Sequence, residues 1–112
     1  MDKNCVFCRV ISGEFPSEKV YEDDIILAIK DISPVAPHHI LILPKKHSDD
    51  FMHTSTAEIA DIFAKVPLIA EKLGIKDKGF RLVINTGDDG GQTVDHMHVH
   101  LLGGRAMNWP PG

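Results

Sequence analysis

The chain has 112 residues, the length of one domain, so we expect residues 1–112 to form a single domain rather than two independent cores. Hydrophobic residues make up 43% and the net charge is -4, with lysines and arginines scattered, which argues against disorder and against a polymeric nucleic-acid partner. Polar residues interrupt every apolar run well before the roughly 18 residues of a membrane span, so we expect no membrane association and a cytoplasmic protein.

The first half of the chain predicts a short helix, a hairpin and a buried strand. Residues 5–12 predict a helix that ends at Gly13, and residues 20–22 and 25–30 predict the strands of a hairpin. Residues 40–43 form an apolar, partly β-branched run that a proline closes, which is typical of a strand buried on both faces.

The second half predicts one long helix and two strands. Residues 56–73 carry apolar side chains at spacings of three and four, which indicates an amphipathic helix, and Pro67 predicts a kink or a short break in it. Strands are expected at residues 80–85 and 94–102, with a glycine-rich loop at 86–92 between them. Strands outnumber helices and their connections are short, so we expect an α+β fold with an antiparallel sheet.

Three histidines alternate with apolar residues in the last predicted strand: His96, His98 and His100. A period of two places the three imidazoles on one face of a strand. Two of them could share a zinc ion, but the backbones of His96 and His100 would lie about 13 Å apart, too far for three bonds to one metal. The other use of such a row is chemistry on an anion, in which a neutral imidazole attacks phosphorus.

A candidate phosphate cradle lies directly upstream of the histidines. Gly90 and Gly91 allow backbone amides to approach oxygens, and Gln92 and Thr93 add side-chain donors. Imidazoles and amides can supply the charge stabilisation of phosphoryl transfer, so this scheme needs no catalytic metal.

The two cysteines, Cys5 and Cys8, have the spacing of metal ligands or redox thiols. A structural zinc site requires two further donors. The alternative is a metal-free pair of thiols in a short helix.

The histidine row resembles the signature of the histidine-triad (HIT) family. The resemblance extends to the nucleotide-binding, phosphoramidase branch of the family through these segments: 31–34, 36–39, 44–47, 90–94 and 103–112. It implies a five-stranded antiparallel sheet with a long and a short helix, and a homodimer in which two sheets join. It also implies hydrolysis of purine nucleoside 5′-phosphoramidates, including adenosine 5′-monophosphoramidate, through a covalent nucleotidyl intermediate on His98 that water then hydrolyses.

The same resemblance implies roles for residues around a purine nucleotide of the AMP or GMP type. Asp31 is expected to bind the ribose hydroxyls, and Ile32 and Phe7 to line the base cleft. The residues expected around the phosphate are Asn85, Gly91, Gln92, Thr93, His39 and His100. Thr93 or His100 is expected to pass a proton to the leaving group. Thr93 stands where members of this branch often have serine, and its additional methyl group is expected to narrow the leaving-group side of the site.

Two further expectations come from the resemblance. Members that carry the two cysteines often complete a structural zinc site with two histidines, which correspond to His47 and His96. The C-terminal segment is expected near the active site of a partner subunit, where Trp109 would either pack or contact substrate.

Three other functions stay open at this point. A dinucleoside polyphosphate hydrolase of the fragile-histidine-triad branch shares the segment 92–94, although the C-terminal Trp-Pro-Pro-Gly favours the phosphoramidase branch. A regulatory nucleotide-binding protein would use the same pocket without turnover. A zinc-dependent hydrolase would hold a catalytic metal at the histidine row.

Overall fold

The computed structural model describes residues 4–112, so residues 1–3 of the expected domain lie outside the described part. Five antiparallel strands form one sheet in the order β1-β2-β3-β5-β4. The strands are β1 (Lys19–Glu22), β2 (Ile26–Lys30), β3 (His38–Pro44), β4 (Phe80–Val83) and β5 (Val99–Gly103). The predicted α+β class and five-stranded antiparallel sheet are confirmed.

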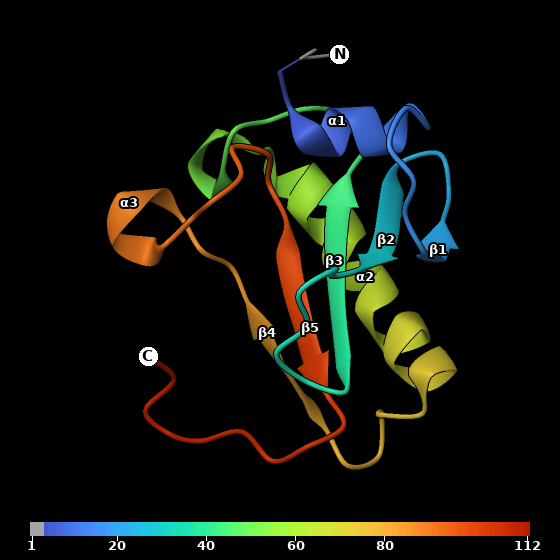
Figure 1. The fold of residues 1–112 in the computed structure, drawn as a ribbon, viewed down its shortest axis with the longest axis vertical. Coiled ribbons are helices and arrows are strands. Elements are labelled where there is room, and N and C mark those ends of the chain that lie inside the picture. Colours follow the sequence, from blue (N-terminus) through green and yellow to red (C-terminus); the bar gives the residue numbers. More distant parts are fainter. Residues whose placement is uncertain (1–3) are drawn as a thin grey trace.

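Two helices cover opposite faces of this sheet (Figure 1). The long helix α2 (Thr56–Leu73) packs on one face, and the short helix α1 (Val6–Ile11) packs on the other. Two single turns, η1 (Phe51–His53) and α3 (Gly87–Gly90), lie in connections, and α3 occupies the loop that was expected to be irregular. The predicted long and short helices are therefore confirmed.

Helix α2 runs without interruption through Pro67, so the predicted short break is wrong. Its start is capped by Ser55, whose Oγ accepts from the backbone amide of Glu58 at 3.2 Å and donates to that residue's carboxylate at 2.8 Å. Gly74 ends it with φ of +74°. Pro67 lies on the exposed side of the helix, where water can bond the carbonyl that has lost its donor, while the opposite side is fixed by packing on the sheet.

The strand that carries the histidines begins at Val99, later than predicted, so His96 and His98 precede it. The cause is long-range: the amide of Met97 donates to the carbonyl of Ser48 at 2.8 Å, and that of His96 donates to Val94 at 2.9 Å, instead of joining the ladder. The side chains still alternate between the two faces. Met97 and Val99 lie in the core under α2, whereas the histidines lie on the α1 side.

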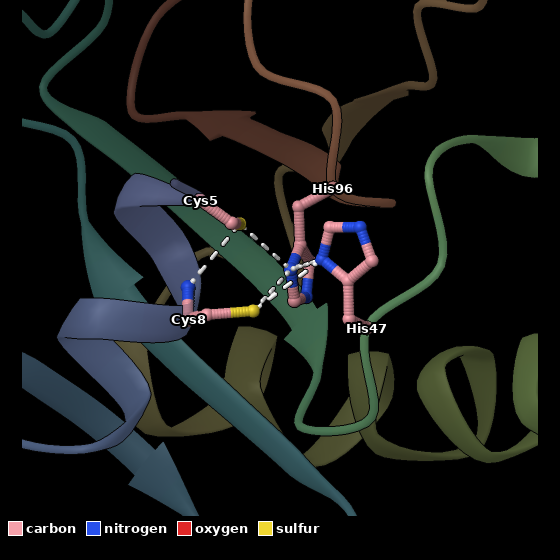
Figure 2. Close-up of side chains that lie close together, drawn as sticks. All are labelled: Cys5, Cys8, His47 and His96. Carbon is pink, nitrogen blue, oxygen red and sulfur yellow. Dashed lines mark hydrogen bonds between the residues drawn. The ribbon is translucent and has the colours of Figure 1, made fainter. Parts of the chain in front are cut away.

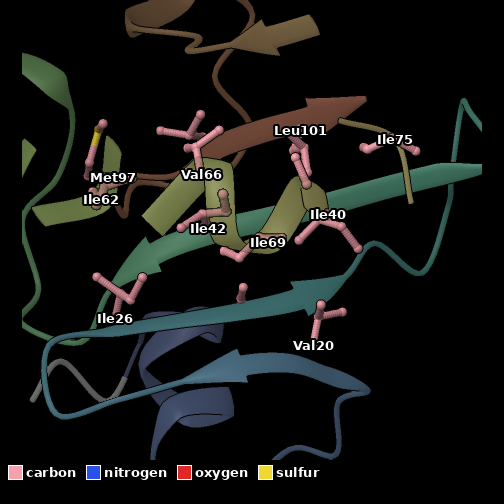
Figure 3. Packing of buried hydrophobic residues seen from close by; sticks show 13 residues of the cluster. Val20, Ile26, Ile40, Ile42, Ile62, Val66, Ile69, Ile75, Met97 and Leu101 are labelled. Atoms are coloured by element: carbon pink, nitrogen blue, oxygen red, sulfur yellow. The ribbon is translucent and has the colours of Figure 1, made fainter. Parts of the chain in front are cut away.

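Buried side chains form one cluster on each face of the sheet. Ile40 and Ile42 of β3 point into the cluster under α2, and Leu41 and Leu43 point into the cluster under α1. Figure 3 shows α2 contributing Ile62, Val66 and Ile69 to the first cluster. The predicted burial of this strand on both faces is confirmed. Within residues 4–112, no helix combines the length and apolar character required to cross a membrane.

Leu101→Ala is expected to lower the free energy of unfolding by about 2 to 5 kcal/mol, because this β5 side chain is fully buried between the sheet and α2. Leu68→Ala is the matched control, since Leu68 is 48% exposed on α2 and should cost less than about 1 kcal/mol. Urea unfolding of both variants measures the difference. Equal losses would mean that Leu101 does not anchor the core.

Candidate functional site

A cavity of about 430 Å³ opens between α1 and the sheet on the histidine side. Its wall is mostly apolar, and it brings together six of the residues predicted for the site: Phe7, Asp31, Ile32, Thr93, His98 and His100. Phe7 reaches it from α1, and Asp31 and Ile32 follow the end of β2. The size suits a small organic ligand.

His98 is held as a neutral nucleophile would need to be. Its Nδ1 lies 2.6 Å from the carbonyl oxygen of His96, and because a carbonyl can only accept, Nδ1 carries the proton. The lone pair therefore resides on Nε2. The ring of Phe7 packs edge-on against His98 with centroids 5.1 Å apart, and only 6% of His98 is exposed.

His39 fixes the tautomer of His100. The amide of Val35 donates to His39 Nδ1 at 3.2 Å, so a neutral His39 has its proton on Nε2. That proton points to His100 Nδ1 at 2.9 Å, with Asp31 Oδ2 at 3.3 Å as a second acceptor. His100 consequently carries its proton on Nε2 and can act as a donor, whereas His98 has a lone pair on its Nε2.

The Asp31, His39 and His100 donor atoms lie within 4.8 Å of one another, a spacing that would also allow a metal ion. A metal on His39 Nε2 would force the proton onto Nδ1, directly against the Val35 amide that donates there. The hydrogen-bond pattern of Asp31, His39 and His100 therefore favours a proton relay over a metal site at these residues.

Burial depresses the pKa of His100 to about 4, and the neighbouring His98 and His39 add to the effect. Between about pH 6.5 and 4 the unfolded chain therefore binds more protons than the folded protein, and stability should fall as pH falls through this window. Thermal unfolding from pH 7.5 to 4.5 measures this loss. His100→Asn should flatten the dependence.

His53→Ala is the control for that series. Asp50 raises the pKa of His53, so the contribution of this histidine to stability is constant below its unfolded pKa and is lost only as pH rises above it, and His53→Ala should leave the slope between about pH 6.5 and 4.5 unchanged. An unaltered acid slope in His100→Asn would contradict the assignment.

A second cluster joins Cys5, Cys8, His47 and His96, the four residues predicted to bind zinc (Figure 2). Nδ1 of His96 lies 3.3 Å from Cys5 Sγ and 3.6 Å from Cys8 Sγ. Nδ1 of His47 lies 3.3 Å from Cys8 Sγ and 3.2 Å from His96 Nδ1. Tetrahedral zinc with bonds of about 2.0 to 2.3 Å separates its ligand atoms by about 3.3 to 3.8 Å, close to this arrangement.

The hydrogen bonds that His47 and His96 make through Nε2 fix the tautomer that a metal ion requires. His96 Nε2 donates to the Pro44 carbonyl at 2.8 Å, and His47 Nε2 donates to Asp49 Oδ1 at 2.9 Å. Both Nδ1 atoms then carry lone pairs, and these face each other inside the cluster. Burial raises the pKa of the Cys5 thiol, so a cation is needed to keep it as a thiolate. The four residues fit a tetrahedral metal site.

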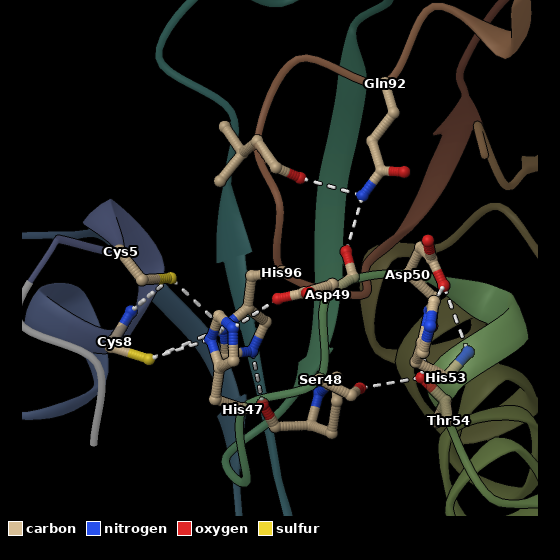
Figure 4. Close-up of polar contacts among 12 residues, drawn as sticks. Cys5, Cys8, His47, Ser48, Asp49, Asp50, His53, Thr54, Gln92 and His96 are labelled. Atoms are coloured by element: carbon tan, nitrogen blue, oxygen red, sulfur yellow. Dashed lines mark hydrogen bonds and ion pairs between the residues drawn. The ribbon is translucent and has the colours of Figure 1, made fainter. Parts of the chain in front are cut away.

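In the glycine-rich loop, the donors of two residues expected in the phosphate cradle, Gly91 and Gln92, bond within the protein. Gly91, with φ of +78°, caps α3 and donates its amide to Asp88. Both amide hydrogens of Gln92 go to carbonyls, those of Asp49 at 2.7 Å and Val94 at 3.0 Å (Figure 4). Of the predicted phosphate contacts in this loop, Thr93 lines the cavity.

Two other predicted substrate contacts are not among the described residues that line the cavity. Asn85 is half-buried between β4 and α3, and Trp109 is 82% exposed in the C-terminal segment. Arg81 donates to the carbonyl of Asn108 at 2.8 Å, which holds that segment beside β4.

Several cavity and cluster residues were not predicted from the sequence. Val10 lines the cavity one turn after Phe7, and the helical period of α1 could have identified it. Lys30, at the end of β2, also lines it. Asp49 orients His47 from two residues further along, but no motif marks it.

Comparison with known proteins places this geometry in a family. The model of the HIT domain matches residues 12–107. A 14 kDa zinc-binding protein of Brassica juncea is 47% identical over 96% of this chain and 98% of its own length. The Adenylylsulfatase HINT1 of Arabidopsis thaliana is 45% identical over 99% of this chain and 78% of its own.

Among solved structures, a HIT family hydrolase from Legionella pneumophila aligns with a TM-score of 0.93 at 46% identity. The alignment covers 97% of this chain and 100% of that one. The family model spans most of the sequence, and the relatives match along nearly its whole length. The chain therefore belongs to the histidine-triad family.

Proposed function

We propose that this protein hydrolyses purine nucleoside 5′-phosphoramidates, with His98 as the nucleophile. The observation that carries the proposal is the orientation of His98, whose Nδ1–H is held by a carbonyl while its Nε2 lone pair is left for attack at the cavity. The names of relatives, a HIT family hydrolase and an adenylylsulfatase, support hydrolysis at a nucleotide phosphorus.

In the proposed reaction, His98 Nε2 forms a bond to the α-phosphorus and the phosphorus–nitrogen bond of the substrate breaks. The leaving amine takes up a proton through the Thr93 hydroxyl or the Nε2–H of His100, and solvent replaces that proton. Water then attacks the nucleotidyl-histidine, which releases the nucleoside monophosphate and restores neutral His98.

The substrate is proposed to occupy the cavity with its base against the apolar part of the wall, to which α1 contributes Phe7 and the segment after β2 contributes Ile32. Asp31 is proposed to bind the ribose hydroxyls. One of its carboxylate oxygens accepts from the amide of Ser33 at 2.7 Å, which fixes the orientation of the group. We further propose a homodimer in which the exposed edge of β4 joins two sheets and brings Trp109 toward the partner subunit's cavity.

We propose that zinc occupies the Cys5, Cys8, His47 and His96 cluster as a structural ion. When bound, zinc supplies a cross-link between α1 and the segment before β5. Two relatives named as 14 kDa zinc-binding proteins support this assignment. His98 and the cavity carry the reaction, and the cluster supports them.

The test is release of amine from a fluorogenic adenosine 5′-phosphoramidate, with adenylyl sulfate assayed in parallel. Adenylyl sulfate is the second candidate substrate because a relative is named adenylylsulfatase. Turnover that is reduced but persists in strong chelator supports the metal-free reaction. No turnover of either compound, with tight binding of AMP, would replace the proposal with a nucleotide-binding function.

A further inference from the structure

The side chain of Gln92 bonds to three separate pieces of the chain. Its Oε1 accepts from the amide of Gly87 at 3.0 Å, which fixes the start of α3. Its Nε2 donates to the carbonyls of Asp49 and Val94 at 2.7 and 3.0 Å. Every hydrogen-bonding group of this amide thus has a partner in the backbone, and no donor remains for a phosphate.

The contact between Gln92 and Asp49 leads to the metal cluster. Asp49 accepts the Gln92 hydrogen on its backbone oxygen and the His47 Nε2 hydrogen on its carboxylate, as Figure 4 shows. Gln92 therefore holds the backbone of the residue that orients a cluster ligand. Partners of this kind decide how a metal-binding imidazole points.

The contact between Gln92 and Val94 leads to the nucleophile. The Val94 carbonyl accepts from Gln92 and also from the amide of His96 at 2.9 Å. The carbonyl of His96 in turn accepts from His98 Nδ1 at 2.6 Å. One amide side chain thus holds the segment whose carbonyl orients the attacking imidazole.

We propose that Gln92 is a positioning residue that couples the Cys5, Cys8, His47 and His96 cluster to His98, in place of the phosphate contact that the family resemblance implies for it. The inference rests on the proposed function, because it takes His98 as the nucleophile and a metal ion in the cluster. One side-chain hydrogen of Gln92 holds Asp49, the residue that orients His47, and the other holds the segment whose carbonyl orients His98.

Two substitutions separate the contacts. Gln92→Glu keeps an acceptor for Gly87 but has no hydrogen for the two carbonyls, and Gln92→Met removes all three bonds at similar size. Asp88→Asn is the matched control, since it exchanges a carboxylate and an amide in the same loop on an exposed side chain. Each protein is purified as the full zinc-loaded chain, and its thermal unfolding is checked first.

The main measurement is the rate at which zinc passes to a chromogenic chelator, which needs no turnover. Both Gln92 variants should release zinc about 10-fold faster than wild type and Asp88→Asn, in the range that loss of an outer partner produces. Nitrogen-15 spectra of the imidazoles should show His98 as an Nδ1–H form in wild type and as mixed tautomers in the variants. With substrate, kcat should fall about 10-fold while KM changes little.

Unchanged zinc release in both variants would overturn the coupling, and a loss of turnover alone would then assign Gln92 to the substrate. Faster release with an unchanged His98 spectrum would overturn the link to the nucleophile. If wild type turns over no nucleotide, the proposed function has failed, but the zinc and spectral measurements still decide the role of Gln92.

Discussion

Replacing His98 with alanine should lower kcat for an adenosine 5′-phosphoramidate by at least about 10⁴-fold, because no other side chain among the described residues that line the cavity offers a comparable imidazole lone pair. His100 cannot substitute, since its Nδ1 is occupied by His39 and its Nε2 carries a proton. Steady-state release of amine measures the loss. Mass spectrometry of briefly mixed samples should detect a nucleoside monophosphate adduct on wild type and none on His98→Ala.

His53→Ala is the control for this variant. His53 is exposed and bonds Asp50 at 2.6 Å, away from the cavity, so its loss should leave kcat unchanged. Circular dichroism shows whether His98→Ala has kept its fold after losing a buried ring. More than about one per cent of wild-type turnover in a folded His98→Ala protein would exclude the nucleotidyl-histidine route.

Cys8→Ser should produce the second large effect, loss of bound zinc and a fall in Tm of about 10 °C. Serine is close in size to cysteine, so packing around this fully buried position is nearly kept, while the thiolate ligand is lost. Without the ion, the facing Nδ1 lone pairs of His47 and His96 lie 3.2 Å apart with no shared cation. Metal analysis and thermal unfolding measure the two changes.

Chelator treatment provides the matched comparison. It should lower the Tm of wild type to that of Cys8→Ser and leave the variant unmoved. If wild type melts at the same temperature before and after metal removal, the cluster does not stabilise the fold through an ion.

The sequence predicted the parts of the fold and site that local periodicity encodes. Alternation in the last strand correctly separates Met97 and Val99 from the histidines, because side-chain direction follows the extended backbone even before the ladder begins. It could not place the start of β5, since that depends on the Ser48 carbonyl, 49 residues away from the amide of Met97. Long-range backbone bonds leave no mark in a local pattern.

The glycine-rich loop shows the same limit for the site. Its composition correctly indicates backbone groups without bulky side chains, but it does not say which acceptors they meet. The amide of Gly91 donates to Asp88 within the loop, and the side chain of Gln92 donates to the carbonyl of Asp49. Asp49 escaped prediction because an aspartate beside another in a polar segment is typical of a solvated loop.

Helix α1 belongs to two structures at once. Its first turn carries Cys8 and is preceded by Cys5, while Phe7 and Val10 of the same six residues form a wall of the cavity. An ion at one side and a nucleotide at the other would therefore hold the same helix. Their binding equilibria are then thermodynamically linked. The ion and the nucleotide therefore change each other's binding affinity by the same factor.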